Sequence, residues 1–165
     1  METAAMTSAF LVGVAAGGRS MTGLAAIALT TRPGTGYAVL DRAASTPGRA
    51  ALTASAAVEL GADKLPRTPS RLSTAGLTSR IASGAAGGAA LALRARRNPL
   101  LGAAVGAAGA VAGSYAGAYW RRWIGREQVA AFVAAVAEDC LTAATALAAC
   151  TLAPQRNPTA GGRHA

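Results

Sequence analysis

The stretch from Leu100 to Trp120 constrains this chain most, because it holds 21 residues and no charged side chain. A helix rises about 1.5 Å per residue, so the stretch would reach across a bilayer's hydrocarbon core of roughly 30 Å. Three arginines come shortly before it and three shortly after it: Arg94, Arg96, Arg97, Arg121, Arg122 and Arg126. Basic residues at both ends of an apolar helix are typical of a segment whose ends meet phospholipid headgroups. We therefore expect this stretch to cross a membrane.

Five glycines recur along the same stretch at helical spacing. They are Gly102, Gly106, Gly109, Gly113 and Gly117. On a helix, these positions form one narrow stripe. In a soluble helix each of them would cost about 1 kcal/mol relative to alanine. In a membrane, the stripe lets a second helix approach closely, so we expect these glycines to be helix-packing residues.

The composition agrees with a membrane location. The mean hydropathy is +0.34 and 52% of residues are apolar, but only 4% are aromatic, so a soluble core of large side chains would be poorly filled. The sequence predicts an all-α fold: a small polytopic membrane bundle of four to five hydrophobic helices in one domain, residues 1–153. We expect it in a bacterial plasma membrane, as a multi-pass protein, and followed by a polar disordered tail, residues 154–165.

The first apolar run, from Ala4 to Thr31, is interrupted at Gly17-Gly18-Arg19-Ser20. It is either one helix with a mid-membrane arginine or two half-helices joined at the glycines. Proline and glycine punctuate residues 32–49, which we expect to be a loop. The following run, Ala50 to Ala62, has only 13 residues. It either extends through Asp63 and Lys64 or is a re-entrant or interfacial segment.

A third run, from Ser73 to Leu93, carries small residues at helical spacing. Residues 94–99 connect it to the glycine-rich stretch, and so short a connection predicts an antiparallel hairpin of the two helices. The last run, from Val129 to Leu152, is long enough to cross a membrane with tilt.

Seven ionisable residues lie within or at the rim of these apolar runs: Arg19, Glu59, Asp63, Lys64, Arg80, Glu138 and Asp139. Each would cost about 2.5–3.5 kcal/mol at the centre of a membrane helix, so we expect them to form a polar intramembrane cluster. Pairing of Arg19 with Glu138 or Glu59 would remove much of that cost. The pairs either fix the register of the helices or line a hydrated path for a small solute or ion. In the second case the four acids are candidate ligands or proton carriers, and Arg19 and Arg80 are their counter-charges.

Other classes of function leave no pattern in the sequence. No nucleophile–base arrangement, metal motif or phosphate loop is visible, so we expect no enzyme, metal or cofactor. The net charge of +9 comes mainly from arginines between apolar runs, without the aromatic motifs of nucleic-acid binding. The expected partner is the lipid bilayer. Transport or sensing of a small solute or ion is the leading hypothesis. The alternative is a structural or accessory protein whose glycine-rich helix packs against a membrane partner or a second copy.

Several of these segments resemble one known family. They are Gly17 to Gly23, Glu59 to Arg71, the alanine–glycine hairpin and Ala137-Glu138-Asp139. Together they are similar to the bacterial membrane proteins grouped as domain of unknown function 4126. The resemblance covers the chain from about Phe10 to Leu152, and its most specific part is the acid-x-x-x-Asp-Lys-x-Pro element that begins at Glu59. It implies an integral membrane protein and assigns no activity.

Overall fold

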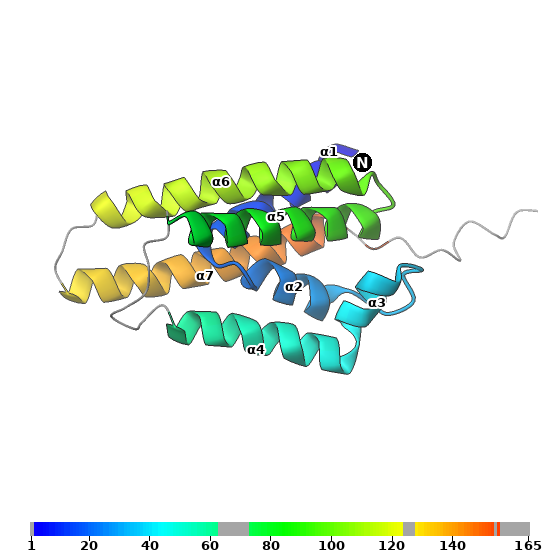
Figure 1. Ribbon diagram of the computed structural model, residues 1–165, viewed down its shortest axis with the longest axis horizontal. Coiled ribbons are helices and arrows are strands. Elements are labelled where there is room, and N and C mark those ends of the chain that lie inside the picture. The colour runs from blue at the N-terminus through cyan, green and yellow to red at the C-terminus, as the bar shows by residue number, and fades with distance from the viewer. Residues whose placement is uncertain (1, 63–72, 124–127, 154, 156–165) are drawn as a thin grey trace, which may run out of the picture.

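The structure is a computed structural model of the chain, and it describes residues 2–62, 73–123, 128–153 and 155. Within these ranges it contains seven helices and no strand, so the predicted all-α class is confirmed (Figure 1). The helices are α1 (Glu2–Gly18), α2 (Thr22–Thr30), α3 (Ala38–Ala44), α4 (Thr46–Ala62), α5 (Thr74–Arg94), α6 (Pro99–Trp123) and α7 (Gln128–Leu152).

Helices α5 and α6 form the predicted antiparallel hairpin. The Ser73 side chain accepts a hydrogen bond from the Gly76 amide and starts α5. Pro99 opens α6, where its missing N–H is no loss. Gly102 packs against Gly88 of α5, and Gly106 packs against Gly84. Because no side chain stands between these positions, the two backbones approach closely.

The glycine stripe of α6 contacts a second helix farther along. Gly109 packs against the backbone of Phe10 in α1, and Gly113 packs against Val14. The two contacts advance by four residues on both helices, so α1 and α6 run parallel. Gly117 is half-buried and lines a cavity. Four of the five glycines therefore pack within the chain.

The first apolar run consists of two helices that fold back on each other. Gly23 of α2 contacts Val12 of α1, and both Val12 and Ile27 lie beside Gly87 of α5. In one straight helix, Val12 and Gly23 would be about 16 Å apart. Of the two alternatives, the pair of half-helices is therefore correct. In addition, the chain reverses direction between them, as the paths of α1 and α2 in Figure 1 show.

The prediction of a loop over residues 32–49 is wrong in part, because α3 and the start of α4 lie there. Pro47 falls in the first turn of α4, a position that proline favours because no intrahelical N–H is needed. Helix α4 packs against α2 and α3, and none of its described side chains is fully buried. The short run after residue 49 is thus the body of a peripheral helix. Its expected extension through Asp63 and Lys64 lies outside the described residues.

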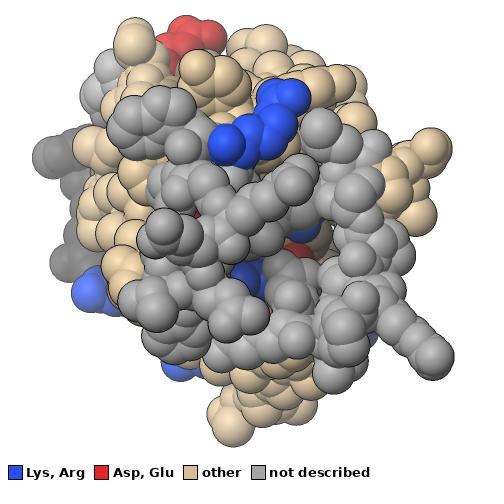
Figure 2. Space-filling view, turned by 90° about the vertical axis from the view of Figure 1, so that its left-hand side faces the viewer, with Lys and Arg blue, Asp and Glu red and all other residues tan. Residues whose placement is uncertain are grey.

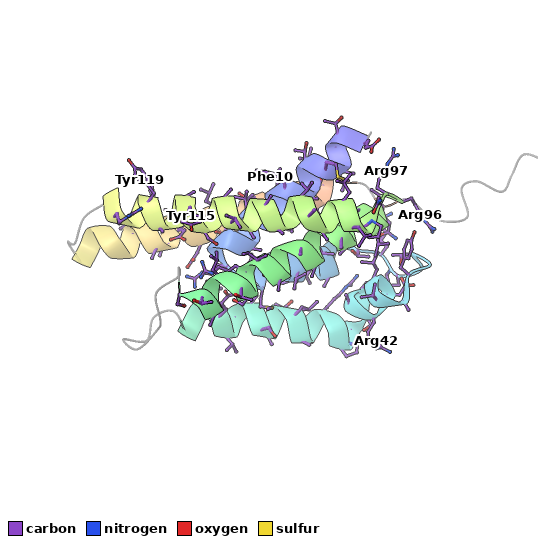
Figure 3. All side chains as sticks on the ribbon, turned by 45° about the horizontal axis from the view of Figure 1, so that its top comes forward. Phe10, Arg42, Arg96, Arg97, Tyr115 and Tyr119 are labelled. Atoms are coloured by element: carbon purple, nitrogen blue, oxygen red, sulfur yellow. The ribbon has the colours of Figure 1, made fainter. Side chains whose placement is uncertain are left out.

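Large apolar side chains lie on the outside of this fold and small ones fill its interior. The buried core is mostly alanine with glycine and serine, whereas Tyr115, Tyr119 and Leu141 are exposed by 55%, 66% and 69%. Tyr119 projects from α6 away from the other helices in Figure 3. Two segments, Pro99–Trp120 and Val133–Leu152, are long and apolar enough to cross a membrane, and only 33% and 22% of them is buried.

Candidate functional site

The site begins with Arg19, Ser20 and Met21, which join α1 to α2 and are called here the hairpin tip. Gly17, just before the tip, packs against Ala110 and Ser114 of α6. Ser114 lies well inside the 25 residues of α6, far from both helix ends. The hairpin tip is therefore in the interior of the helix bundle, between the last helical hydrogen bond of α1, from the Arg19 amide to the Ala15 carbonyl, and the start of α2.

An ion pair connects the hairpin tip to the middle of α7. The Arg19 guanidinium donates to the Asp139 carboxylate, with Nε 2.8 Å and Nη2 2.7 Å from Oδ1. The Arg19 side chain is 4% exposed and that of Asp139 is 24% exposed. Desolvation of a guanidinium buried to this extent costs several kcal/mol unless polar groups compensate it, and here the Asp139 carboxylate supplies a counter-charge.

Glu59 binds the start of α2 from α4. Its Oε1 accepts from the Ser20 amide at 2.7 Å, and its Oε2 accepts from the Met21 amide at 2.8 Å. The first amides of a helix have no intrahelical acceptor, and the partial positive charge of the helix N-terminus favours an anion. Glu59 thus caps α2, although the two segments are almost forty residues apart in the sequence.

Arg80 of α5 performs the opposite task at the end of α1. Its Nη1 donates to the Gly17 carbonyl oxygen at 2.7 Å, and its side chain is buried. The last carbonyls of a helix lack intrahelical donors and carry partial negative charge, so a cation is favourable there. The Ser114 hydroxyl lies 3.4 Å from the same oxygen. Charged side chains from α4 and α5 therefore satisfy both helix ends that meet at the hairpin tip.

The structure brings together four of the seven predicted cluster residues: Arg19, Glu59, Arg80 and Asp139. Arg19 pairs with Asp139, whereas we expected Glu59 or Glu138 as its partner. Glu138 lines a neighbouring cavity, so the two adjacent acids of α7 face different parts of the molecule. Asp63 and Lys64 lie outside the described residues.

That cavity has a volume of about 240 Å³ and lies between α1, α6 and α7. It is lined by Val14, Ala15, Gly18, Gly113, Ala116, Gly117, Trp120, Ala137, Glu138, Leu141, Thr142 and Thr145. The Thr142 side chain contacts Gly18, the residue before the hairpin tip. The cavity and the hairpin tip are therefore neighbours.

Figure 2 shows the end of the molecule where α6 ends and α5 begins. Small areas of positive and of negative side chains are visible near the middle of this face.

At the opposite end, arginines bind the ends of helices. Arg94 donates to the carbonyl oxygens of Cys150 and Ala153, at the end of α7, and to the Thr30 hydroxyl. Arg49 donates to the carbonyl oxygens of Ala28 and Thr31 at the end of α2. Sequence reasoning assigned arginines of this kind to lipid headgroups, and no local signal reveals which carbonyls they reach.

The same end contains an ordered loop before α3. The Asp41 carboxylate accepts from the amides of Thr35 and Gly34, both at 2.9 Å, and from the Thr35 hydroxyl at 3.0 Å. Hydrogen bonds from Thr35, foremost its amide, hold the pKa of Asp41 below its usual value. Arg96 donates to the Thr35 carbonyl and lies over the Tyr37 ring. Figure 3 shows Arg96 and Arg97 near each other at this end, with Arg42 farther below.

Of the predicted tail, 154–165, the structure describes Gln155. Its side chain accepts from the Arg32 amide and donates to the Arg32 carbonyl, both at 2.8 Å. At least this residue is attached to the loop before α3.

Among the residues that the structure describes, no three His, Cys, Asp or Glu side chains are close enough to hold a metal ion. The resemblance to domain of unknown function 4126 stays a prediction. No protein-family model, no curated protein and no solved structure matches this chain.

Proposed function

We propose that this chain is a non-catalytic, multi-pass protein of a bacterial plasma membrane. Helices α1, α5, α6 and α7 form the embedded bundle, and α2 returns inside it. The distribution of side chains supports this proposal, because a soluble protein would bury helices as apolar as α6 and α7. A core of alanine and glycine under an outer layer of large apolar residues suits packing in lipid. Membership of domain of unknown function 4126 belongs to the same proposal.

The proposed function is to move or sense a small solute or ion at the hairpin tip. One observation carries it: the Arg19–Asp139 ion pair and the Glu59 carboxylate meet where a helix is interrupted inside the bundle. Irregular backbone is tolerated at membrane depth where it is buried in protein or lines a water-filled cavity. Interrupted helices with charged groups at their ends form the binding sites of many transporters.

Proteoliposomes test this function. The purified protein is reconstituted, and fluxes of protons, Na⁺ and K⁺ are followed with entrapped fluorescent indicators under an imposed gradient. We expect Asp139→Asn and Glu59→Gln to reduce the flux of the transported ion at least tenfold. Glu2→Gln is the matched control, because Glu2 is exposed at the start of α1 and far from the tip. Wild-type flux in a folded Asp139→Asn variant would refute a carrier role.

A structural or accessory protein is the second candidate, and one observation favours it. Charged groups from α4 and α7 satisfy groups of the hairpin tip, and Arg80 of α5 satisfies the Gly17 carbonyl just before it, which is what a purely structural network requires. The double variant Arg19→Gln with Asp139→Asn separates the two functions. It removes both charges of the pair. If the role is structural, we expect a folded protein whose ion flux equals that of the wild type. If the protein is a carrier, we expect the flux to be lost. In either case a partner must use another surface than Gly102, Gly106, Gly109 and Gly113, which contact the chain itself.

A further inference from the structure

The cavity between α1, α6 and α7 has the features of a separate binding site. In the part of the chain that the structure describes, α6 and α7 are the two helices long and apolar enough to cross a membrane, yet they contact each other little. The cavity lies between them with α1 behind it. Its volume of about 240 Å³ is smaller than the ~300–1,000 Å³ of pockets for drug-sized ligands. A ligand of about one aromatic ring with a small substituent is therefore the matching size.

The walls of this cavity are mostly apolar, and among its described lining residues Glu138 is the charged one. Val14 and Leu141 supply apolar surface, and Ala116 and Gly117 leave the space open. The Thr145 hydroxyl donates to the Leu141 carbonyl of its own helix, so this donor is already engaged. The Glu138 carboxylate is the charge that a ligand would meet.

Trp120 adds an aromatic surface at the α6 side of the cavity. An indole face attracts cations, and the attraction is larger where water is excluded. A carboxylate lining the same cavity, as Glu138 does, adds Coulomb attraction, which is stronger in a medium of low polarity than in water. Glu138 and Trp120 each have interaction partners in the protein, and a carboxylate has about four acceptor positions, so it can serve a second positive group.

We propose that this cavity binds a small lipophilic cation, a molecule with one aromatic ring and a quaternary ammonium group. An anion would be repelled by Glu138, and a neutral hydrocarbon would gain nothing from it. A hydrated metal ion needs several oxygen ligands, whereas these walls are mainly carbon. Since Gly18 lines the cavity and directly precedes the hairpin tip, the inference deepens the proposed function by naming a solute class. It rests on that function only for the passage of the cation, and not for its binding.

The experiment measures binding in detergent by equilibrium dialysis with radiolabelled benzyltrimethylammonium. We expect saturable binding of one cation per chain. Glu138→Gln should weaken the affinity at least tenfold, because the charge is lost while the shape is kept. Glu2→Gln should bind as the wild type does. Neopentylbenzene has the same shape with carbon in place of the charged nitrogen, and we expect it not to displace the bound cation.

A second pair of variants tests the place of binding. Ala116→Leu fills the cavity and keeps the carboxylate, so it should also weaken the affinity at least tenfold. Ala112→Leu adds the same side chain at an exposed position of α6 that does not line the cavity, and it should leave the affinity unchanged. Size-exclusion profiles of all variants show whether they are folded.

Three results would overturn the proposal: no binding to the folded wild type, equal affinity in Glu138→Gln, or displacement by neopentylbenzene as effective as by the unlabelled cation. The last would identify a neutral occupant such as a lipid acyl chain. Binding without any flux in proteoliposomes would support this site and refute transport. An ion flux that depends on Asp139, without binding of the aromatic cation, would support transport and refute this site.

Discussion

Replacing Gly84 by alanine tests the close packing on which this fold depends. Gly84 of α5 lies where three helices meet. A Cβ added there would be 2.7 Å from the Ala110 Cβ and 2.8 Å from the Gly106 carbonyl oxygen, both in α6, and 3.4 Å from the Gly13 Cα in α1. Ordinary van der Waals contact begins near the last of these distances. Helix α6 must therefore move away by about 0.6 Å.

The magnitude follows from two opposing effects. Adding a methyl group to a well-packed interior costs ~1–3 kcal/mol. Alanine improves on glycine in helix propensity by up to ~1 kcal/mol. The free energy of unfolding should therefore fall by about 1–2 kcal/mol in Gly84→Ala. A fall of this size would be visible because it changes the ratio of folded to unfolded protein by roughly tenfold.

Gly61→Ala is the matched control. Gly61 is exposed near the end of α4, and nothing lies within 4 Å of the added Cβ. The same substitution should raise the free energy of unfolding there by at most ~1 kcal/mol, because only helix propensity changes. Unfolding in mixed detergent micelles with increasing dodecyl sulfate, followed by circular dichroism, measures both variants. If Gly84→Ala is as stable as Gly61→Ala, the reasoning about close helix contact is wrong.

Three further predictions concern charged residues. Asp139→Asn removes the ion-pair partner of the buried Arg19. We expect the free energy of unfolding to fall by about 2 kcal/mol, less than the ~3–5 kcal/mol lost when a fully buried pair is broken. In the same unfolding assay, the double variant with Arg19→Gln should recover most of the lost free energy. Arg94→Ala leaves carbonyl groups at the end of α7 without their hydrogen-bond donor, and each buried group left unsatisfied costs ~1–3 kcal/mol of stability. We therefore expect faster amide hydrogen exchange in the last turn of α7. The pKa of Asp41 is lowered in the folded protein, so its contribution to stability is complete above the unfolded pKa of about 3.9 and is lost as the pH falls through the folded value. In the wild type, proteolysis of residues 32–40 should become faster as the pH falls below the folded pKa of Asp41. In Asp41→Asn the proteolysis rate should no longer change at that pH. If the two proteins show the same pH profile, Asp41 does not order this loop.

The sequence alone determined much of the local structure of this protein, although it did not predict α3 or the first turn of α4. Spacing and length predicted the three helices between Thr74 and Leu152, and the short connection after Arg94 predicted the antiparallel hairpin of α5 and α6. The Gly-Gly-Arg-Ser interruption correctly marked a break in the first apolar run. These properties depend on the backbone and on neighbours within a few residues, so a linear pattern contains them.

Only the tertiary structure decided how the segments meet. The reversal of the chain at Ser20, the cap that Glu59 places on α2 and the choice of Asp139 over Glu138 as the partner of Arg19 depend on contacts between helices. The rotation of a helix about its axis selects which of two adjacent acids faces a neighbour, since they are 100° apart. For α7 that rotation is set by its packing against α1 and α2, and no single segment of the sequence contains this information.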